Sequence, residues 1–263
     1  NGHVVNSNIF PSVINSNERM TYTVVNAILD NDEIMVARYQ YLKNFFDDMA
    51  DLASILSDAR YLRGAIDFET KEPKFKVDEK GYPLEIYIKP RGIAEGIIEE
   101  FMLMANETVA KTINQMELPF IYRVHEAPDK KKINAVLNVI KNMGYKAGFL
   151  SDEITPKDCQ SLLLSLEGKP GAEGINILML RSMMKARYSE ECLGHYGLAL
   201  KYYTHFTSPI RRYPDTLVHR MLHEFLFEKK TNQENINYWV NHLPEFALYT
   251  SQCEKTAVDC ERD

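Results

Sequence analysis

The residues best suited to chemistry lie close together, between His195 and Asp215. Two adjacent arginines, Arg211 and Arg212, stand there among aromatic, histidine and hydroxyl side chains. Pro214 is typical of a first helical position, and Asp215 in a first turn complements the helix dipole. Free backbone N–H groups at a helix N-terminus favour anions, and guanidinium groups match phosphate oxygens with paired hydrogen bonds. The stretch therefore predicts an anion site.

A simpler interpretation has equal weight on local physics. Arg211 and Arg212 can be ordinary surface residues, one of them pairing with Asp215. Aromatic clusters are more often part of a core than stacking platforms, so Tyr202 and Tyr203 are assigned mainly to packing. Local physics suggests an anion site and goes no further.

The elements that must position this stretch are a mixture of helices and short strands. Apolar spacing predicts helices over 18–29, 33–61, 93–116, 130–143, 157–166, 175–185, 214–228 and from about 244 onward. Strands are predicted over 3–13, 65–68, 74–77, 84–88, 120–124 and 197–203, with a turn at 78–81. The inward face of the helix at 33–61 is predicted to hold Tyr41, Phe45, Met49, Leu52 and Ile55. The fold class is thus mixed α/β (α+β), in one body.

Composition limits the possible functions. The chain has 263 residues, 45% of them hydrophobic and 26% charged, as in ordinary globular proteins. No apolar run approaches the roughly 18–20 residues that span a bilayer, and the start lacks signal-peptide features, so no membrane partner and a cytoplasmic location are expected. The four cysteines lack metal-site spacing and are expected to be reduced thiols. The net charge of −6 means that RNA binding would need a local basic groove.

The same stretch also resembles a known family. HYGLAL at 195–200, HFTSPIRRYPD at 205–215 and HR at 219–220 closely resemble the signature of the RNB family, the exoribonucleases of the ribonuclease R and ribonuclease II type. Further similar segments are RGAIDFE at 63–69, IEEFMLMAN at 98–106, FIYRVHEAP at 120–128 and LRSMMKARY at 180–188. The resemblance covers nearly the whole chain in the right order.

This resemblance implies a partial RNB-type catalytic domain over 1–263. Its members are processive, hydrolytic 3′→5′ exoribonucleases that act on the 3′ end of single-stranded RNA and release nucleoside 5′-monophosphates, with magnesium and no organic cofactor. The family's metal-binding aspartates precede everything seen here, and no Asp-x-x-x-x-x-Asp-x-Asp-Asp pattern occurs. The last helical pattern also ends without a cap or breaker. We therefore expect the metal ligands and the OB-type domains to lie outside this chain, and the chain alone to be inactive.

Site residues are carried over where the motifs match. Arg211 is expected to contact the phosphate near the scissile bond and stabilise transition-state charge, with Arg212 assisting at an adjacent phosphate. The expected RNA-binding residues are Phe68, which stacks on the terminal base or is a core strand residue, Glu99 or Glu100 near the 3′-terminal ribose, Tyr213, and Glu261 near the channel.

Other roles and alternatives complete the expectations. Glu95, Glu99 and Asn106 share one helix stripe, as a polar wall or as a solvated face. The histidines of the motif are expected to be structural. A different class of function is a catalytically silent RNA-binding module. A weaker hypothesis is a self-contained metal nuclease using Glu95, Glu99 and Asp215.

Overall fold

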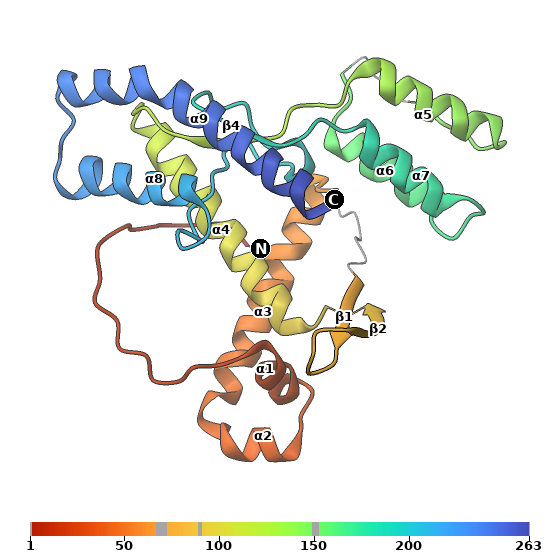
Figure 1. Cartoon of the computed structure of the whole chain (residues 1–263), viewed down its shortest axis with the longest axis horizontal. Coiled ribbons are helices and arrows are strands. Elements are labelled where there is room, and N and C mark those ends of the chain that lie inside the picture. The colour runs from red at the N-terminus through yellow and green to blue at the C-terminus, as the bar shows by residue number, and fades with distance from the viewer. Residues whose placement is uncertain (1, 67–72, 89–90, 149–152, 263) are drawn as a thin grey trace. The chain divides into compact units, whose positions relative to one another are not determined.

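A computed structural model describes residues 2–66, 73–88, 91–148 and 153–262 (Figure 1). The chain divides into two compact units. The first unit holds Asn15–Asp58 and the described residues of the range 73–101. The second unit holds His3–Ile14, Ala59–Ile66 and the described residues from Met102 onward. Helices α3 (Gln40–Arg63) and α4 (Ile93–Gln115) each contribute residues to both. The 195–215 motif lies in the second unit.

In the first unit, two short helices pack with the beginnings of α3 and α4. They are α1 (Tyr22–Leu29) and α2 (Glu33–Arg38). The core consists of Val25, Ile28, Phe46 and Ala94. Asn26 joins α1 to α4, because its Oδ1 accepts the Ala94 N–H at 2.8 Å and its Nδ2 donates to Glu95 at 2.8 Å.

A hairpin of β1 (Pro73–Val77) and β2 (Pro83–Ile88) also belongs to the first unit. The strands are antiparallel, with Phe75 opposite Ile86. Its turn is closed by Asp78, whose carboxylate accepts the N–H groups of Lys80 at 2.9 Å and Tyr82 at 2.8 Å. The turn predicted at 78–81 is confirmed.

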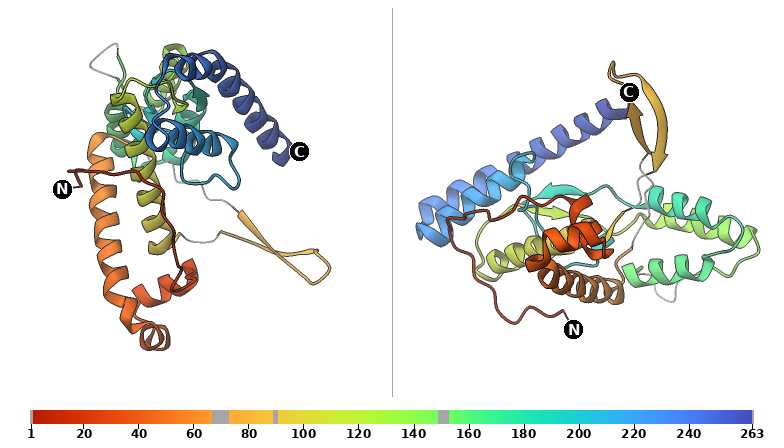
Figure 2. Two further views of the ribbon diagram at one scale, coloured as in Figure 1. Left: turned by 90° about the vertical axis from the view of Figure 1, so that its left-hand side faces the viewer. Right: turned by 90° about the horizontal axis from the view of Figure 1, so that it is seen from below.

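The second unit contains five further helices and a small sheet. The helices are α5 (Lys130–Asn142), α6 (Pro156–Leu166), α7 (Ala172–Ser182), α8 (Tyr213–Leu222) and α9 (Gln233–Arg262). Strands β3 (Tyr122–Val124) and β4 (Arg187–Ser189) pair antiparallel. The core includes Phe120, Ile121, Leu217, Phe225 and Trp239. Helix α9 lies against β4, and α5, α6 and α7 form a neighbouring group (Figure 2).

The prediction of a mixed fold with long helices and short strands is confirmed, with helices dominating. Some elements were predicted wrongly. Residues 3–13 form no strand and have no regular structure. The helix predicted over 33–61 is interrupted at Tyr39, and its buried residues include Phe46, Ala53 and Leu56 in place of the predicted stripe, where Phe45 is 57% exposed. Both stripes carry apolar residues, so periodicity alone favoured the wrong one.

Two further corrections concern the second unit. Residues 197–203 form no strand, because the chain turns through a 3₁₀ segment at Tyr196–Leu198. The last helix begins well before Pro244 and continues through it. Proline removes one backbone donor, but Leu243 and Ala247 on either side are buried and hold the helix in place.

The structure also bears on the cysteines and on membrane-spanning helices. Cys159, Cys192, Cys253 and Cys260 are all free thiols, as predicted. None of the described helices has both the length and the apolar character needed to cross a membrane.

Candidate phosphate-binding site

Strand β3 is the element on which the motif is built. One edge pairs with β4, where Arg123 lies opposite Tyr188. Other backbone groups of this stretch bind the motif: Arg123 N–H donates to the Tyr203 carbonyl at 3.0 Å, and His125 N–H donates to the Gly194 carbonyl at 3.0 Å. The segment 194–203 is therefore held along β3 by main-chain hydrogen bonds.

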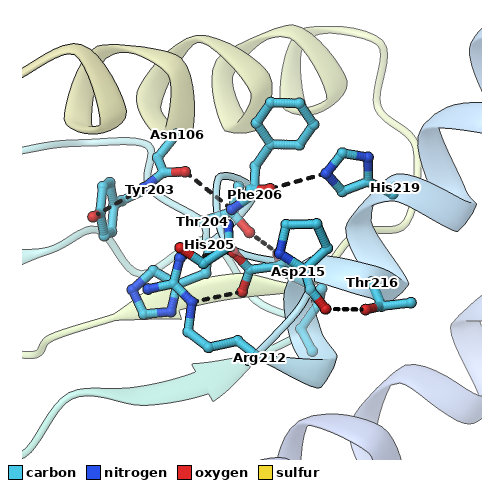
Figure 3. A network of polar contacts seen from close by, with 12 residues as sticks. Asn106, Tyr203, Thr204, His205, Phe206, Arg212, Asp215, Thr216 and His219 are labelled. Atoms are coloured by element: carbon cyan, nitrogen blue, oxygen red, sulfur yellow. Dashed lines mark hydrogen bonds and ion pairs between the residues drawn. The ribbon is translucent and has the colours of Figure 1, made fainter. Parts of the chain in front are cut away.

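Buried polar side chains then fix the path of the chain after Tyr203 (Figure 3). The Thr204 hydroxyl donates to the Ile121 carbonyl at 2.7 Å. Asn106, only 2% exposed on α4, accepts the Phe206 N–H at 3.0 Å and donates to the Tyr203 hydroxyl at 3.3 Å. A buried amide satisfied at both ends specifies one backbone position, because any shift would leave buried polar groups without partners.

Asp215 closes the loop that leads into α8. Its carboxylate is fully buried and accepts the Ser208 N–H at 2.7 Å. The same carboxylate accepts two hydrogen bonds from the Arg212 guanidinium, from Nε at 2.9 Å and Nη2 at 2.7 Å (Figure 3). The Thr216 hydroxyl also donates to the Pro209 carbonyl at 3.0 Å. Both ends of the 208–215 loop are thus attached to one buried carboxylate.

Arg211 differs from its neighbour. Its side chain is exposed and forms no hydrogen bond or ion pair with the described residues. It stands directly before α8, whose N-cap residue Arg212 gives no side-chain capping bond. An uncapped helix N-terminus beside an exposed guanidinium can bind a phosphate. The pairing of one arginine with Asp215 agrees with the simpler interpretation, while Arg211 keeps the features of the anion site.

Two motif histidines, His195 and His205, are partly buried beside the loop and have lowered pKa values. His205 Nδ1 lies 2.8 Å from the Tyr188 hydroxyl. Burial, reinforced by the positive charges of Arg212 and Arg123, lowers the pKa of His205 to about 2. Burial also lowers the pKa of His195 to about 3. These contacts agree with the expectation of structural histidines.

The other predicted RNA-binding residues belong to different elements. Tyr213 is the first residue of α8 and is 54% exposed, and Glu261 is exposed near the end of α9. In the first unit, Glu99 forms an ion pair with Arg91, whereas Glu100 is buried beside a cavity of about 210 Å³. Phe68 lies outside the described residues. Arg211, Arg212 and Tyr213 are thus adjacent at the start of α8 in the second unit, whereas Glu99 and Glu100 belong to the first unit.

Sequence analysis gave the pairing of one arginine with Asp215 as an alternative, but it missed the other residues that hold the loop. Asn106 was expected on a polar stripe of α4, yet it is buried, and Glu95 on the same stripe is bonded to Asn26. Arg123 stands within a segment similar to the family, but no local pattern indicated its ion pair with Glu254. The one available signal for Asn106 was its place directly after the apolar run Phe101–Ala105.

The described residues do not fit a metal centre. They contain no group of three or more His, Cys, Asp or Glu side chains placed to hold a metal ion. Both Asp215 oxygens already accept hydrogen bonds from Arg212. Magnesium needs several oxygen ligands in a near-octahedral arrangement, so no catalytic step is assigned to a metal at these residues.

Comparison with known proteins defines the class. A family model described as the RNB domain matches residues 1–228, and the chain belongs to the RNB family. Within that family it is similar to ribonuclease R: ribonuclease R 1 of Lactococcus lactis is 44% identical over 262 residues, covering 100% of this chain and 32% of that protein. The chain thus spans about a third of the length of the curated relatives it matches. The resemblance predicted from the motifs is confirmed.

Solved structures agree with the fold. Mycoplasma genitalium ribonuclease R, in complex with ribose methylated single-stranded RNA, is 32% identical with a TM-score of 0.82, covering 92% of this chain and 38% of that chain. It is also solved in complex with double-stranded RNA. Yeast Ssd1, described as a pseudonuclease, is 27% identical with a TM-score of 0.51, covering 62% of this chain and 20% of that chain. The expected RNB-type fold is confirmed.

Proposed function

We propose that this chain is the phosphate- and ribose-binding part of a processive, magnesium-dependent 3′→5′ exoribonuclease of the ribonuclease R type. Its substrate is the 3′ end of single-stranded RNA, and its products are nucleoside 5′-monophosphates. The observation that carries the proposal is the exposed, unpartnered guanidinium of Arg211, presented beside the uncapped N-terminus of α8 by a loop that the described residues hold in place.

Arg211 acts by electrostatic stabilisation of the scissile phosphate. Charge that develops on the phosphate oxygens is met by a cation that is already in position, so little reorganisation is needed during the reaction. Arg212 has Nε and Nη2 committed to Asp215. Its main role is therefore to position the loop, and its remaining N–H groups are available for an adjacent phosphate.

The rest of the RNA is bound by dispersed contacts. Phe68 stacks on the terminal base, Glu99 or Glu100 accepts a hydrogen bond from the terminal 2′-hydroxyl, and Tyr213 and Glu261 face the RNA. The RNA complexes of the Mycoplasma genitalium relative support RNA as the partner. Because the described residues do not fit a metal centre, we place the magnesium ligands outside them, in the portion of ribonuclease R that this chain does not cover.

The test compares two proteins on one substrate. This chain, and a polypeptide extended to the full length of its ribonuclease R relatives, are incubated with 3′-labelled or 5′-labelled single-stranded RNA and magnesium. The proposal predicts that only the extended protein releases mononucleotides from the 3′ end and that EDTA stops the release. Degradation by this chain alone would place the metal site within these residues and overturn the account of the metal.

A catalytically silent RNA-binding module is the second candidate. It is favoured by the similarity to yeast Ssd1, a pseudonuclease. In that case neither protein would degrade the labelled RNA, yet the extended protein would still shift it in a binding assay. The two candidates differ in the release of mononucleotides, since both predict binding.

A further inference from the structure

The side chain of Arg123 connects strand β3 to helix α9. Its guanidinium forms two hydrogen bonds with the Glu254 carboxylate, Nη1 to Oε2 at 2.5 Å and Nη2 to Oε1 at 2.8 Å. The Arg123 side chain is only 12% exposed, whereas that of Glu254 is 39% exposed. A two-point pair between a guanidinium and a carboxylate fixes orientation as well as distance. The pair therefore joins β3 to α9 with a defined orientation at Glu254.

Arg123 also contacts the motif through its neighbours. Its guanidinium carbon lies 4.7 Å from the centre of the buried Tyr188 ring. The Tyr188 hydroxyl meets His205 at 2.8 Å, and the Tyr188 N–H donates to the Ser251 hydroxyl of α9 at 2.9 Å. The Arg123 backbone N–H donates a hydrogen bond to the Tyr203 carbonyl. One residue thus touches the path of the motif loop and the C-terminal half of α9.

Glu261 lies seven residues beyond Glu254 on the same helix. Seven residues are nearly two turns, so both side chains leave α9 on about the same face, about 10 Å apart along the axis. Among the described residues beyond Glu254, no side chain of α9 forms a hydrogen bond with another element, so the Glu254 pair is the last fixed point before Glu261. A small rotation of α9 at Glu254 would move Glu261.

We propose that Arg123 is a positioning residue: through Glu254 it holds the last turns of α9 at a set distance from the Arg211 loop. The consequence for catalysis rests on the proposed function, in which Glu261 and Arg211 bind one RNA strand. Arg123 itself contacts no reacting atom. Its effect passes through the helix that carries Glu261 and through the sheet edge that carries the loop.

The geometry is tested by distance measurements on this chain. Spin labels are attached to the exposed Cys260 and to Ile210→Cys, a fully exposed loop position, with Cys192 and Cys253 changed to serine. Glu254→Gln and Arg123→Lys are expected to shift or broaden the label-to-label distance distribution. The control Arg187→Gln breaks an exposed ion pair with Glu126, which lies just beyond the end of β3, and should leave the distance distribution unchanged. Unchanged distributions in both test variants, or the same broadening in the control, would overturn the proposal.

The consequence for function is measured on the extended protein. Glu254→Gln is expected to lower kcat on the order of tenfold to a hundredfold with a smaller change in KM, since misplacement affects the reacting geometry more than general RNA binding. Adding Glu261→Ala to it should cause little further loss. If the kcat losses of the two single variants multiply in the double variant, the link between Glu254 and Glu261 is overturned. If Glu261→Ala alone has no effect, the proposed RNA role of Glu261 fails, while the distance measurement still decides the geometry.

Discussion

Arg212 and Asp215 form a two-point ion pair in which the carboxylate is fully buried and the arginine side chain is 19% exposed. One of the two adjacent arginines, Arg212, is therefore bound within the loop and stabilises it. Arg211 is left exposed at the start of α8. We propose on this basis that Arg212 positions the loop and that Arg211 binds the phosphate.

Replacing Asp215 with Asn should strongly destabilise the second unit. The change leaves the mostly buried Arg212 without its counter-charge, and removing one partner of a buried pair costs about 3–5 kcal/mol. Urea unfolding followed by circular dichroism measures the loss in free energy of unfolding. The control Glu228→Gln removes an ion pair with Lys230 in which both side chains are exposed, and should have little effect. Equal small losses in both variants would contradict the role given to Asp215.

Replacing Asn106 with Leu should loosen the motif loop. The Phe206 N–H would lose its acceptor, and an unsatisfied buried backbone group costs about 1–3 kcal/mol. Hydrogen exchange of the Phe206 amide should become faster. Asn114→Leu, on the same helix but bonded to Tyr122, is the matched control and should leave that amide protected. If the Phe206 amide exchanges at the same rate in both variants, Asn106 does not hold the loop at Phe206.

Stability should fall as the pH drops below about 6.5. The pKa of His205 is lowered to about 2 by burial, so below the ordinary pKa of about 6.5 the unfolded chain binds a proton that the folded chain does not. The free energy of unfolding then decreases with falling pH by up to about 1.4 kcal/mol per pH unit for this histidine. His205→Asn should reduce the pH dependence of the free energy of unfolding between pH 6 and pH 5 by about that amount. An unchanged slope would show that His205 titrates normally in the folded chain.

Much of the fold could be predicted from sequence because turn residues, helix caps and apolar spacing indicated the same elements. The turn at Asp78 and the helix that begins near Pro156 follow from residues close in sequence. The interruption at Tyr39 was not predictable, since neither glycine nor proline marks it. The wrong face was assigned to α3 because Phe45 and Phe46 are adjacent and only tertiary packing buries the second.

The turn at 196–198 shows why parts of the site escaped prediction. Its shape depends on one local and one distant histidine nitrogen: His195 Nδ1 accepts the Leu198 N–H at 3.3 Å, and His125 Nδ1, from far away in sequence, accepts the Gly197 N–H at 2.9 Å. Ala199 then takes a positive φ of 51°, which alanine rarely adopts by itself. The motif indicated an anion site near Arg211 and a partner in Asp215, whereas the anchors Asn106 and Ile121 lie far away in sequence.

The most direct test of the account is the effect of Arg211→Ala in the extended protein, with Arg211→Lys as the conservative control. Single-turnover rates and RNA dissociation constants are measured on the same single-stranded RNA. The account predicts a turnover loss on the order of a hundredfold with most RNA affinity retained, because many other phosphate contacts remain and Arg211 acts mainly in the transition state. Arg211→Lys should recover part of the rate. Equal losses of affinity and turnover would contradict the role proposed for Arg211.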